Sequence, residues 1–187
     1  MSCHQLTLLL VLCAVLFWGQ SKAQEERRSR RLSTKIKKTK MLEQHNIVRC
    51  MHGSAPLKWN RKLARQAKRY AKHLASTQCG KLDHSAALDY GENLYYCGAY
   101  GGSVDPDSPC YNPEEVMHSW YDEEVSYLGG HMTQVVWDET TKLGCGRDSC
   151  SKNGWHYDMI VCQYKVKGNN GDASQVKDIV KSREQCE

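Results

Sequence analysis

The chain has 187 residues, enough for one domain with a sizeable hydrophobic core. Hydrophobic residues make up 40% and charged residues 25%, a balance typical of globular proteins and not of disordered or fibrous ones. The only long apolar run lies at the N-terminus, so a membrane-spanning protein is excluded unless that run is retained. Ten cysteines indicate an oxidising compartment, which argues against a cytosolic enzyme.

The N-terminal segment predicts secretion. Leu6–Trp18 is almost wholly apolar, and Ser21 and Ala23 are small residues at the two positions that a signal peptidase reads. We therefore expect a signal peptide over 1–23 and a mature extracellular protein that begins at Gln24. An uncleaved signal anchor is the alternative, but this run is short for a membrane span. Cleavage leaves eight cysteines and no transmembrane segment.

The net charge of +5 comes from a short basic segment. Residues 24–40 carry eight Lys and Arg against two Glu, whereas residues 41–187 carry 17 basic and 19 acidic residues. Because like charges resist compaction, we expect 24–40 to be a disordered leader. Its Arg28–Arg31 stretch resembles a dibasic processing site, with cleavage after Arg31. The leader would suit an acidic polysaccharide or a membrane surface, or would simply be solvated; nothing indicates nucleic acid.

Two helices are predicted first. Met41–Gly53 spaces its apolar residues three or four apart. Asn60 sits at an N-cap position ahead of an apolar stripe, and Gly80 follows as a stop. The basic residues of this second helix lie off the stripe, and we interpret them as a solvated face: Lys62, Arg65, Lys68, Arg69 and Lys72.

A strand and a third helix follow. Glu92–Cys97 is typical of a short strand, and a loop rich in Gly, Ser, Pro and Asp comes next. Asn112–Glu115 offers an N-cap, a proline at the first helical position and Glu115 in place for a capping box. We expect this helix to reach about Tyr127 and to bury Val116, Trp120 and Tyr127.

The remaining elements complete an α+β layered domain. Met132–Asp138 predicts a short helix and Leu143–Gly146 a strand. Trp155–Val166 has apolar residues on both faces, which predicts a central strand that is covered on both sides. This combination of helices and strands favours packed α and β layers.

No common catalytic signature is present. The sequence lacks a His-Glu-x-x-His zinc motif, a Gly-x-Ser-x-Gly elbow, a phosphate-binding glycine loop and a Cys-x-x-Cys pair. What remains is a set of two histidines and two carboxylates: His84, Glu92, Glu123 and His131. Such a set suits a zinc-type ion or a proton-transfer pair, although histidines also serve local hydrogen bonds.

Several ordered motifs resemble the CAP superfamily of cysteine-rich secretory proteins, antigen five proteins and class-one pathogenesis-related proteins. The motifs are His45–Arg49, Pro56–Trp59, Gly91–Leu94, Gly130–Trp137, Leu143–Gly146 and Val161–Tyr164. The resemblance covers roughly 41–170 and implies a three-layer α-β-α sandwich of the CAP/SCP type. It implies one cleft that holds His84, Glu92, Glu123 and His131, with Glu124 as the fallback for Glu123. A divalent cation, Zn²⁺ or another, is the implied ligand.

The resemblance also bears on the other histidines and on the cysteines. His45 matches a position of structural use, whereas His73, His118 and His156 match none and are assigned to the surface or to packing. Eight cysteines allow 105 pairings. Similarity to plant members implies Cys79–Cys150 and Cys145–Cys162. Two further pairs are conjectures, Cys97–Cys110 and Cys50–Cys186, and the second would tie the tail 171–187 to the first helix.

We therefore expect a secreted, non-enzymatic CAP-domain protein that binds a divalent cation and acts through an extracellular protein or lipid partner. Defence, venom and reproductive settings all fit the family. Two alternatives stay open, a metal-dependent extracellular hydrolase and a sterol or lipid carrier. The loop before His131 is short, which argues against the sterol loop of some members, and no cysteine-rich extension follows Cys162.

Overall fold

A computed structural model describes residues 18–22, 24, 36–86, 89–101, 111–122 and 129–187 of the chain. The chain divides into two compact units, Met1–Thr34 and Lys35–Glu187. In the first unit, the described residues 18–22 and 24 are helical. None of the helices in the described residues has the length and apolar character needed to cross a membrane. Most of the predicted signal peptide and leader lies outside the described residues.

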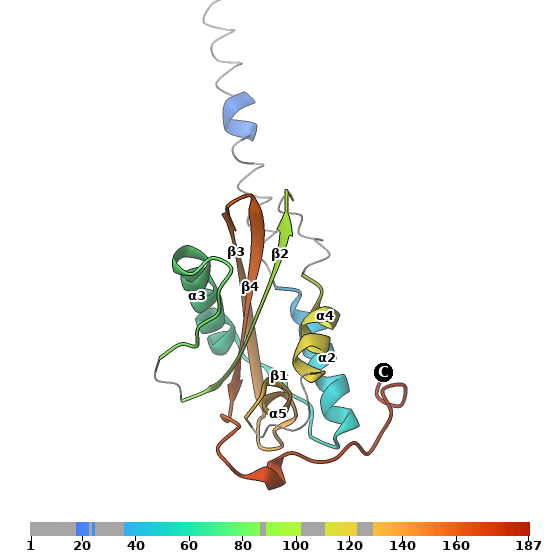
Figure 1. Ribbon diagram of the computed structural model, residues 1–187. Helices are drawn as coiled ribbons and strands as arrows, with labels where there is room; N and C mark the ends of the chain where they lie inside the picture. Colours follow the sequence, from blue (N-terminus) through green and yellow to red (C-terminus); the bar gives the residue numbers. More distant parts are fainter. Residues whose placement is uncertain (1–17, 23, 25–35, 87–88, 102–110, 123–128) are drawn as a thin grey trace, which may run out of the picture. The chain divides into compact units, whose positions relative to one another are not determined.

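The second unit is a sandwich of helices around one sheet (Figure 1). The strands are β1 (Lys58–Trp59), β2 (Gly91–Tyr100), β3 (Lys142–Lys152) and β4 (Trp155–Lys165). Their order across the sheet is β1-β3-β4-β2, with β1 parallel to β3 and the other pairs antiparallel. Helix α3 (Arg61–Thr77) covers one face, and α2 (Lys38–Met51), α4 (Pro113–Tyr121) and α5 (His131–Val136) pack on the other side, so the α-β-α expectation is confirmed.

The central strand has the two-faced pattern that the sequence predicts. On β4, Ile160, Cys162 and Tyr164 face α2 and α4, whereas Met159 and Val161 face α3. All five side chains are buried. Because β4 lies between β3 and β2, both of its edges are paired and both of its faces are covered.

Strand β3 is longer than the predicted Leu143–Gly146. It extends to Lys152 and joins β4 through Asn153-Gly154, whose φ angles of 53° and 78° suit a tight type I′ hairpin turn. Because the second half of β3 is polar, the sequence prediction ended this strand too early. The Asn-Gly pair was the overlooked signal for the hairpin turn. Strand β2 likewise runs beyond the predicted Glu92–Cys97, because it pairs along its whole length with β4.

The boundaries of three helices differ from the predictions. Helix α2 begins at Lys38, inside the predicted leader 24–40, because Ile36 packs against the core and the Lys37 amide donates to the Tyr111 hydroxyl at 2.7 Å. Helix α5 ends at Val136 and not at Asp138. Helix α4 ends at Tyr121; Val116 and Trp120 are buried as expected, whereas Tyr127 lies outside the described residues.

Helix α3 lies unusually close to β3. Asn60 caps it by accepting from the amides of Lys62 and Leu63, as predicted. Two glycines of β3 make the close approach possible, because a Cβ at Gly144 or Gly146 would lie 2.2 Å from a backbone nitrogen of α3. Both positions therefore require the absence of a side chain.

Buried charges join α2 to the rest of the domain and β3 to β4. The Arg49 guanidinium, fully buried on α2, donates to five backbone carbonyls of residues 55 and 135–140. It thereby fixes the end of α5 and the residues that follow it. On the sheet, Arg147 and Asp158 form a buried ion pair whose closest atoms are 2.7 Å apart, and the Tyr111 ring lies 4.1 Å from the guanidinium.

Three disulfides lie in the described residues: Cys50–Cys186, Cys79–Cys150 and Cys145–Cys162. Each is a pair named from the sequence. Cys97 is also disulfide-bonded, and its expected partner, Cys110, lies outside the described residues. The Cys50–Cys186 bond holds the C-terminal segment against α2, where the amides of Val180 and Lys181 donate to the Met51 carbonyl.

Candidate functional site

The site is built where β2 begins at the edge of the sheet. Glu92 pairs in register with Gln163 of β4, and Asn93 pairs with Cys162. Because successive strand residues point to opposite faces, Glu92 turns toward the α3 side and Asn93 toward α5. The Gly91-Glu92-Asn93 motif therefore addresses both faces of the sheet from one short stretch.

The Glu92 carboxylate is fully buried and accepts four hydrogen bonds. Oε1 accepts from the Ser85 amide at 3.0 Å and from His84 Nδ1 at 3.1 Å. Oε2 accepts from the Ser85 hydroxyl at 2.9 Å and from Gln163 Nε2 at 3.0 Å. Burial by itself raises the pKa of this carboxyl, but the hydrogen bonds from His84, Gln163 and Ser85 outweigh it and hold the pKa below its ordinary value. Glu92 is therefore ionised at neutral pH.

His84 is held by Glu92 but remains open to solvent. Its side chain is 59% exposed. The hydrogen bond to Glu92 raises the pKa of the imidazole, against the opposing effect of burial. Because an ionised carboxylate only accepts hydrogen bonds, Nδ1 carries the proton, and a neutral His84 presents the lone pair of Nε2.

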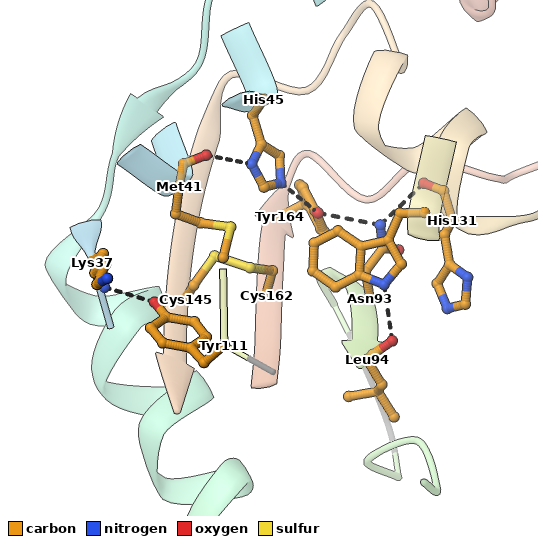
Figure 2. The surroundings of a disulfide bond; sticks show 11 residues. Lys37, Met41, His45, Asn93, Leu94, Tyr111, His131, Cys145, Cys162 and Tyr164 are labelled. Carbon is orange, nitrogen blue, oxygen red and sulfur yellow. Dashed lines mark hydrogen bonds between the residues drawn. A yellow bond between two sulfur atoms is a disulfide. The ribbon is translucent and has the colours of Figure 1, made fainter. Parts of the chain in front are cut away.

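His131 approaches β2 from the other side. It is the first residue of α5, and its half-buried ring stacks on the Trp120 ring with centroids 6.1 Å apart. The His131 carbonyl accepts from Asn93 Nδ2 at 3.0 Å, and the Trp120 indole donates to the Leu94 carbonyl at 2.9 Å. Both aromatic residues are thus anchored to β2 within two residues of Glu92. Figure 2 shows the hydrogen bond between Asn93 and His131.

A buried chain of hydrogen bonds holds the Asn93 side chain in place (Figure 2). Asn93 donates to the Tyr164 hydroxyl at 3.2 Å, and that hydroxyl donates to His45 Nε2 at 2.9 Å. His45 Nδ1 donates to the Met41 carbonyl at 2.7 Å. Burial lowers the pKa of His45 to about 4, so the ring is neutral, and burial raises the pKa of Tyr164 well above its ordinary value. His45 is structural, as the resemblance implied.

The structure describes three of the four predicted ligands, His84, Glu92 and His131. His84 and Glu92 are in direct contact, and the backbone of His131 is hydrogen-bonded to Asn93, the residue that follows Glu92. Glu123 and its fallback Glu124 lie outside the described residues. Within the described part of the chain, no group of three or more His, Cys, Asp or Glu side chains is arranged to hold a metal ion. The four-residue ligand set stays a prediction.

Sequence reasoning missed Ser85 and Gln163, which supply three of the four hydrogen bonds to Glu92. Gln163 had a readable signal, because it is a single polar residue within the apolar run of β4. Ser85 had none, since serines are common in loops. Of the unassigned histidines, His73 and His118 are exposed and His156 is buried.

Comparisons with known proteins place this geometry in a family. A profile of the CAP family, described as the cysteine-rich secretory protein family, matches residues 42–164. The chain is 36% identical over 129 residues to "Repressed by EFG1 protein 1" of Candida albicans, covering 69% of this chain and 45% of that protein. It is 33% identical over 143 residues to pathogenesis-related protein PR-1 of Medicago truncatula, covering 71% and 75%.

The fold has solved counterparts as well. The crystal structure of NaASP2 with Zn²⁺ superposes with a TM-score of 0.50 at 22% identity, covering 75% of this chain and 83% of that one. The chain spans less than half of the length of the Candida relative. Since the family profile matches residues 42–164, most of the sequence, the chain belongs to the CAP family of cysteine-rich secretory proteins.

Proposed function

We propose that this chain is a secreted, non-enzymatic CAP protein whose cleft binds a divalent cation through His84 and His131. The observation that carries the proposal is the contact between His84 Nδ1 and the buried Glu92 carboxylate. A carboxylate that accepts from one imidazole nitrogen fixes the tautomer and makes the other nitrogen a better metal ligand.

The donor chemistry fits a zinc-type ion. Imidazole nitrogens are favoured ligands of Zn²⁺, and a carboxylate commonly completes the set. Glu92 already accepts four hydrogen bonds, so we assign it the role of orienting His84. Glu123 is then the carboxylate of the ligand set. The NaASP2 crystal structure with Zn²⁺ supports the choice of ion.

The alternatives have less support. A hydrolase that uses Glu92 as general base needs a basic carboxylate, whereas the pKa of Glu92 is lowered and both of its oxygens are engaged. For a sterol carrier, an apolar cavity is needed. The pocket of about 510 Å³ between α2 and the C-terminal segment is lined mainly by polar and charged side chains, Glu43 and Glu114 among them. The neighbouring pocket of about 440 Å³ also contains charged side chains, Glu114 and Arg183 among them.

Calorimetric zinc titration tests the proposal. We expect His84→Ala and His131→Ala each to weaken zinc binding strongly, and the exposed His73→Ala on α3 to leave it unchanged. Equal zinc affinity in the parent and the three variants would show that the cation does not bind in the cleft. A parallel peptide-hydrolysis assay, with and without zinc, tests the non-enzymatic assignment: turnover that disappears in His84→Ala would contradict it.

A further inference from the structure

Positive charge in the folded part is concentrated on one helix. Helix α3 carries six of the 17 basic residues that follow Lys40 and none of the 19 acidic ones. The other 11 basic residues therefore stand against all 19 acidic residues. This part of the chain is close to neutral overall but strongly polarised, with α3 as its positive element.

The cations of α3 point away from the domain. Apolar residues of the helix, from Leu63 to Leu74, are buried against the sheet. Lys68 reaches Asp148 at 3.0 Å. The five other cations are exposed and make no ion pair with any residue that the structure describes, and we call them the basic row: Arg61, Lys62, Arg65, Arg69 and Lys72. From Arg61 to Lys72 the row is about 16 Å long, at about 1.5 Å per helical residue.

The positions of these charges destabilise the helix. Arg61 and Lys62 stand in the first turn, where the helix dipole disfavours cations, and no acidic residue accompanies them. Arg61, Arg65 and Arg69 repeat at a spacing of four, and like charges at this spacing repel one another. The basic row therefore destabilises the fold, so its presence needs an explanation other than stability.

The row is rigidly presented. Asn60 caps the helix, Gly144 and Gly146 let it pack directly on β3, and Cys79–Cys150 fixes the chain just after its end. Because the apolar face is already buried in the domain, α3 has no side free to insert into a lipid surface. A partner that lies on α3 therefore contacts its cations and not an apolar helix face.

We propose that the basic row binds a linear acidic polysaccharide, sulfated or carboxylated, that lies along α3. Guanidinium groups match sulfate and carboxylate oxygens with paired hydrogen bonds. Cations arranged in one line match a linear anionic chain better than a flat anionic surface. Disulfides of this density belong outside the cytosol, where nucleic acid is a poor choice of polyanion. The proposal does not depend on the cation site.

Aromatic rings continue the surface beyond the helix end. The Tyr157 ring lies against Gly80, stacks on Trp155 at 6.2 Å, and Trp155 meets Tyr100 edge-on at 5.6 Å. Tyr100 is 73% exposed. Rings of this kind offer apolar faces with polar tips, which suits the C–H faces of sugar rings. This feature distinguishes a polysaccharide from a polyanion without sugars.

A fluorescent heparin oligosaccharide, titrated into the full chain at an ionic strength of about 0.15 M, is the test. Arg65→Gln/Arg69→Gln/Lys72→Gln should weaken binding at least about tenfold. The matched variant Lys142→Gln/Lys167→Gln/Lys181→Gln removes the same charge from other exposed sites and should change affinity less than about threefold. The α3 variant should melt no earlier than the parent, because it relieves repulsion.

Equal losses in both triple variants would overturn the proposal, because only net charge would then matter. So would full binding by the α3 variant combined with loss in Arg27→Gln/Arg28→Gln/Arg30→Gln, which would place the site in the leader. Phosphatidylserine vesicles that bind as tightly, through the same residues, would replace the polysaccharide by a membrane. Tyr100→Ala should weaken heparin binding but not binding of inorganic polyphosphate; equal effects on both would contradict the aromatic contact.

Discussion

At the scale of single residues, two histidines behave in opposite ways because their partners differ. His84 faces a buried carboxylate, which raises the pKa of its imidazole. His45 faces a carbonyl and a tyrosine hydroxyl inside the core, where burial lowers the pKa to about 4. Sequence position alone does not distinguish these cases, since both residues stand in polar surroundings along the chain.

His45 predicts a loss of stability in mild acid. The unfolded chain protonates this histidine below a pKa of about 6.5, whereas the native state resists protonation down to about 4. Between these pH values the unfolded state binds more protons, so stability is complete above about pH 6.5 and falls as the pH decreases toward 4, by up to about 3 kcal/mol. Urea denaturation across this range measures the effect.

His45→Gln keeps an acceptor for the Tyr164 hydroxyl but does not titrate. Its unfolding free energy should fall less steeply than that of the parent between about pH 6.5 and 4. His73→Gln, an exposed control, should keep the parent slope. Parallel slopes for His45→Gln and the parent would contradict the assignment of a buried neutral ring.

Glu92→Gln tests the orienting role assigned to the carboxylate. The amide retains the shape of the side chain but removes its charge and one acceptor, so the hold on His84 weakens. We expect zinc affinity to fall by about 10–100-fold, the usual cost of losing an orienting partner of a metal ligand. An unchanged zinc affinity, measured by calorimetry on a variant with parental near-UV circular dichroism, would rule out that role.

At the scale of secondary structure, the α3 layer depends on the close packing of α3 on β3. A Cβ at Gly146 would lie 2.2 Å from the Lys68 backbone nitrogen, and backbone cannot yield as a flexible side chain can. Gly146→Ala should therefore destabilise the domain by about 3 kcal/mol or more. Ser149→Ala, on the same strand, should cost less than about 1 kcal/mol. Similar unfolding midpoints for both variants would contradict the packing described for α3.

Much of the fold could be predicted from local patterns, and the failures have physical causes. The capping residues Asn60 and Asn112 and the two-faced strand β4 were readable because each depends on neighbours in sequence. The length of β2 was not, since pairing with β4 extends it past its apolar part. The contact of His84 with Glu92 followed from the family resemblance and not from spacing, because a loop brings the two together.

At the scale of the whole molecule, the C-terminal segment is a strap across α2. The Cys50–Cys186 bond joins residues 136 apart, and His52 Nδ1 lies 2.6 Å from the Lys177 carbonyl. Arg183 donates to Gln44 of α2 at 2.7 Å. The segment therefore closes the domain by linking its last residues to its first helix.

Removing the strap should destabilise the protein. Closing so long a loop limits the unfolded chain, so Cys50→Ala/Cys186→Ala should lower the free energy of unfolding by about 2–5 kcal/mol. Amide exchange should rise in 171–187 and at the end of α2, but not in β4. A variant with parental stability and exchange would show that the noncovalent contacts suffice.

The central claim is that Glu92 fixes the His84 tautomer so that Nε2 is free to bind a cation. Nitrogen-15 NMR of the imidazole rings tests it most directly. We predict that neutral His84 carries its proton on Nδ1 and that zinc shifts the resonance of Nε2, with His73 unaffected. A proton on Nε2, or an His84 ring that ignores saturating zinc, would contradict the account.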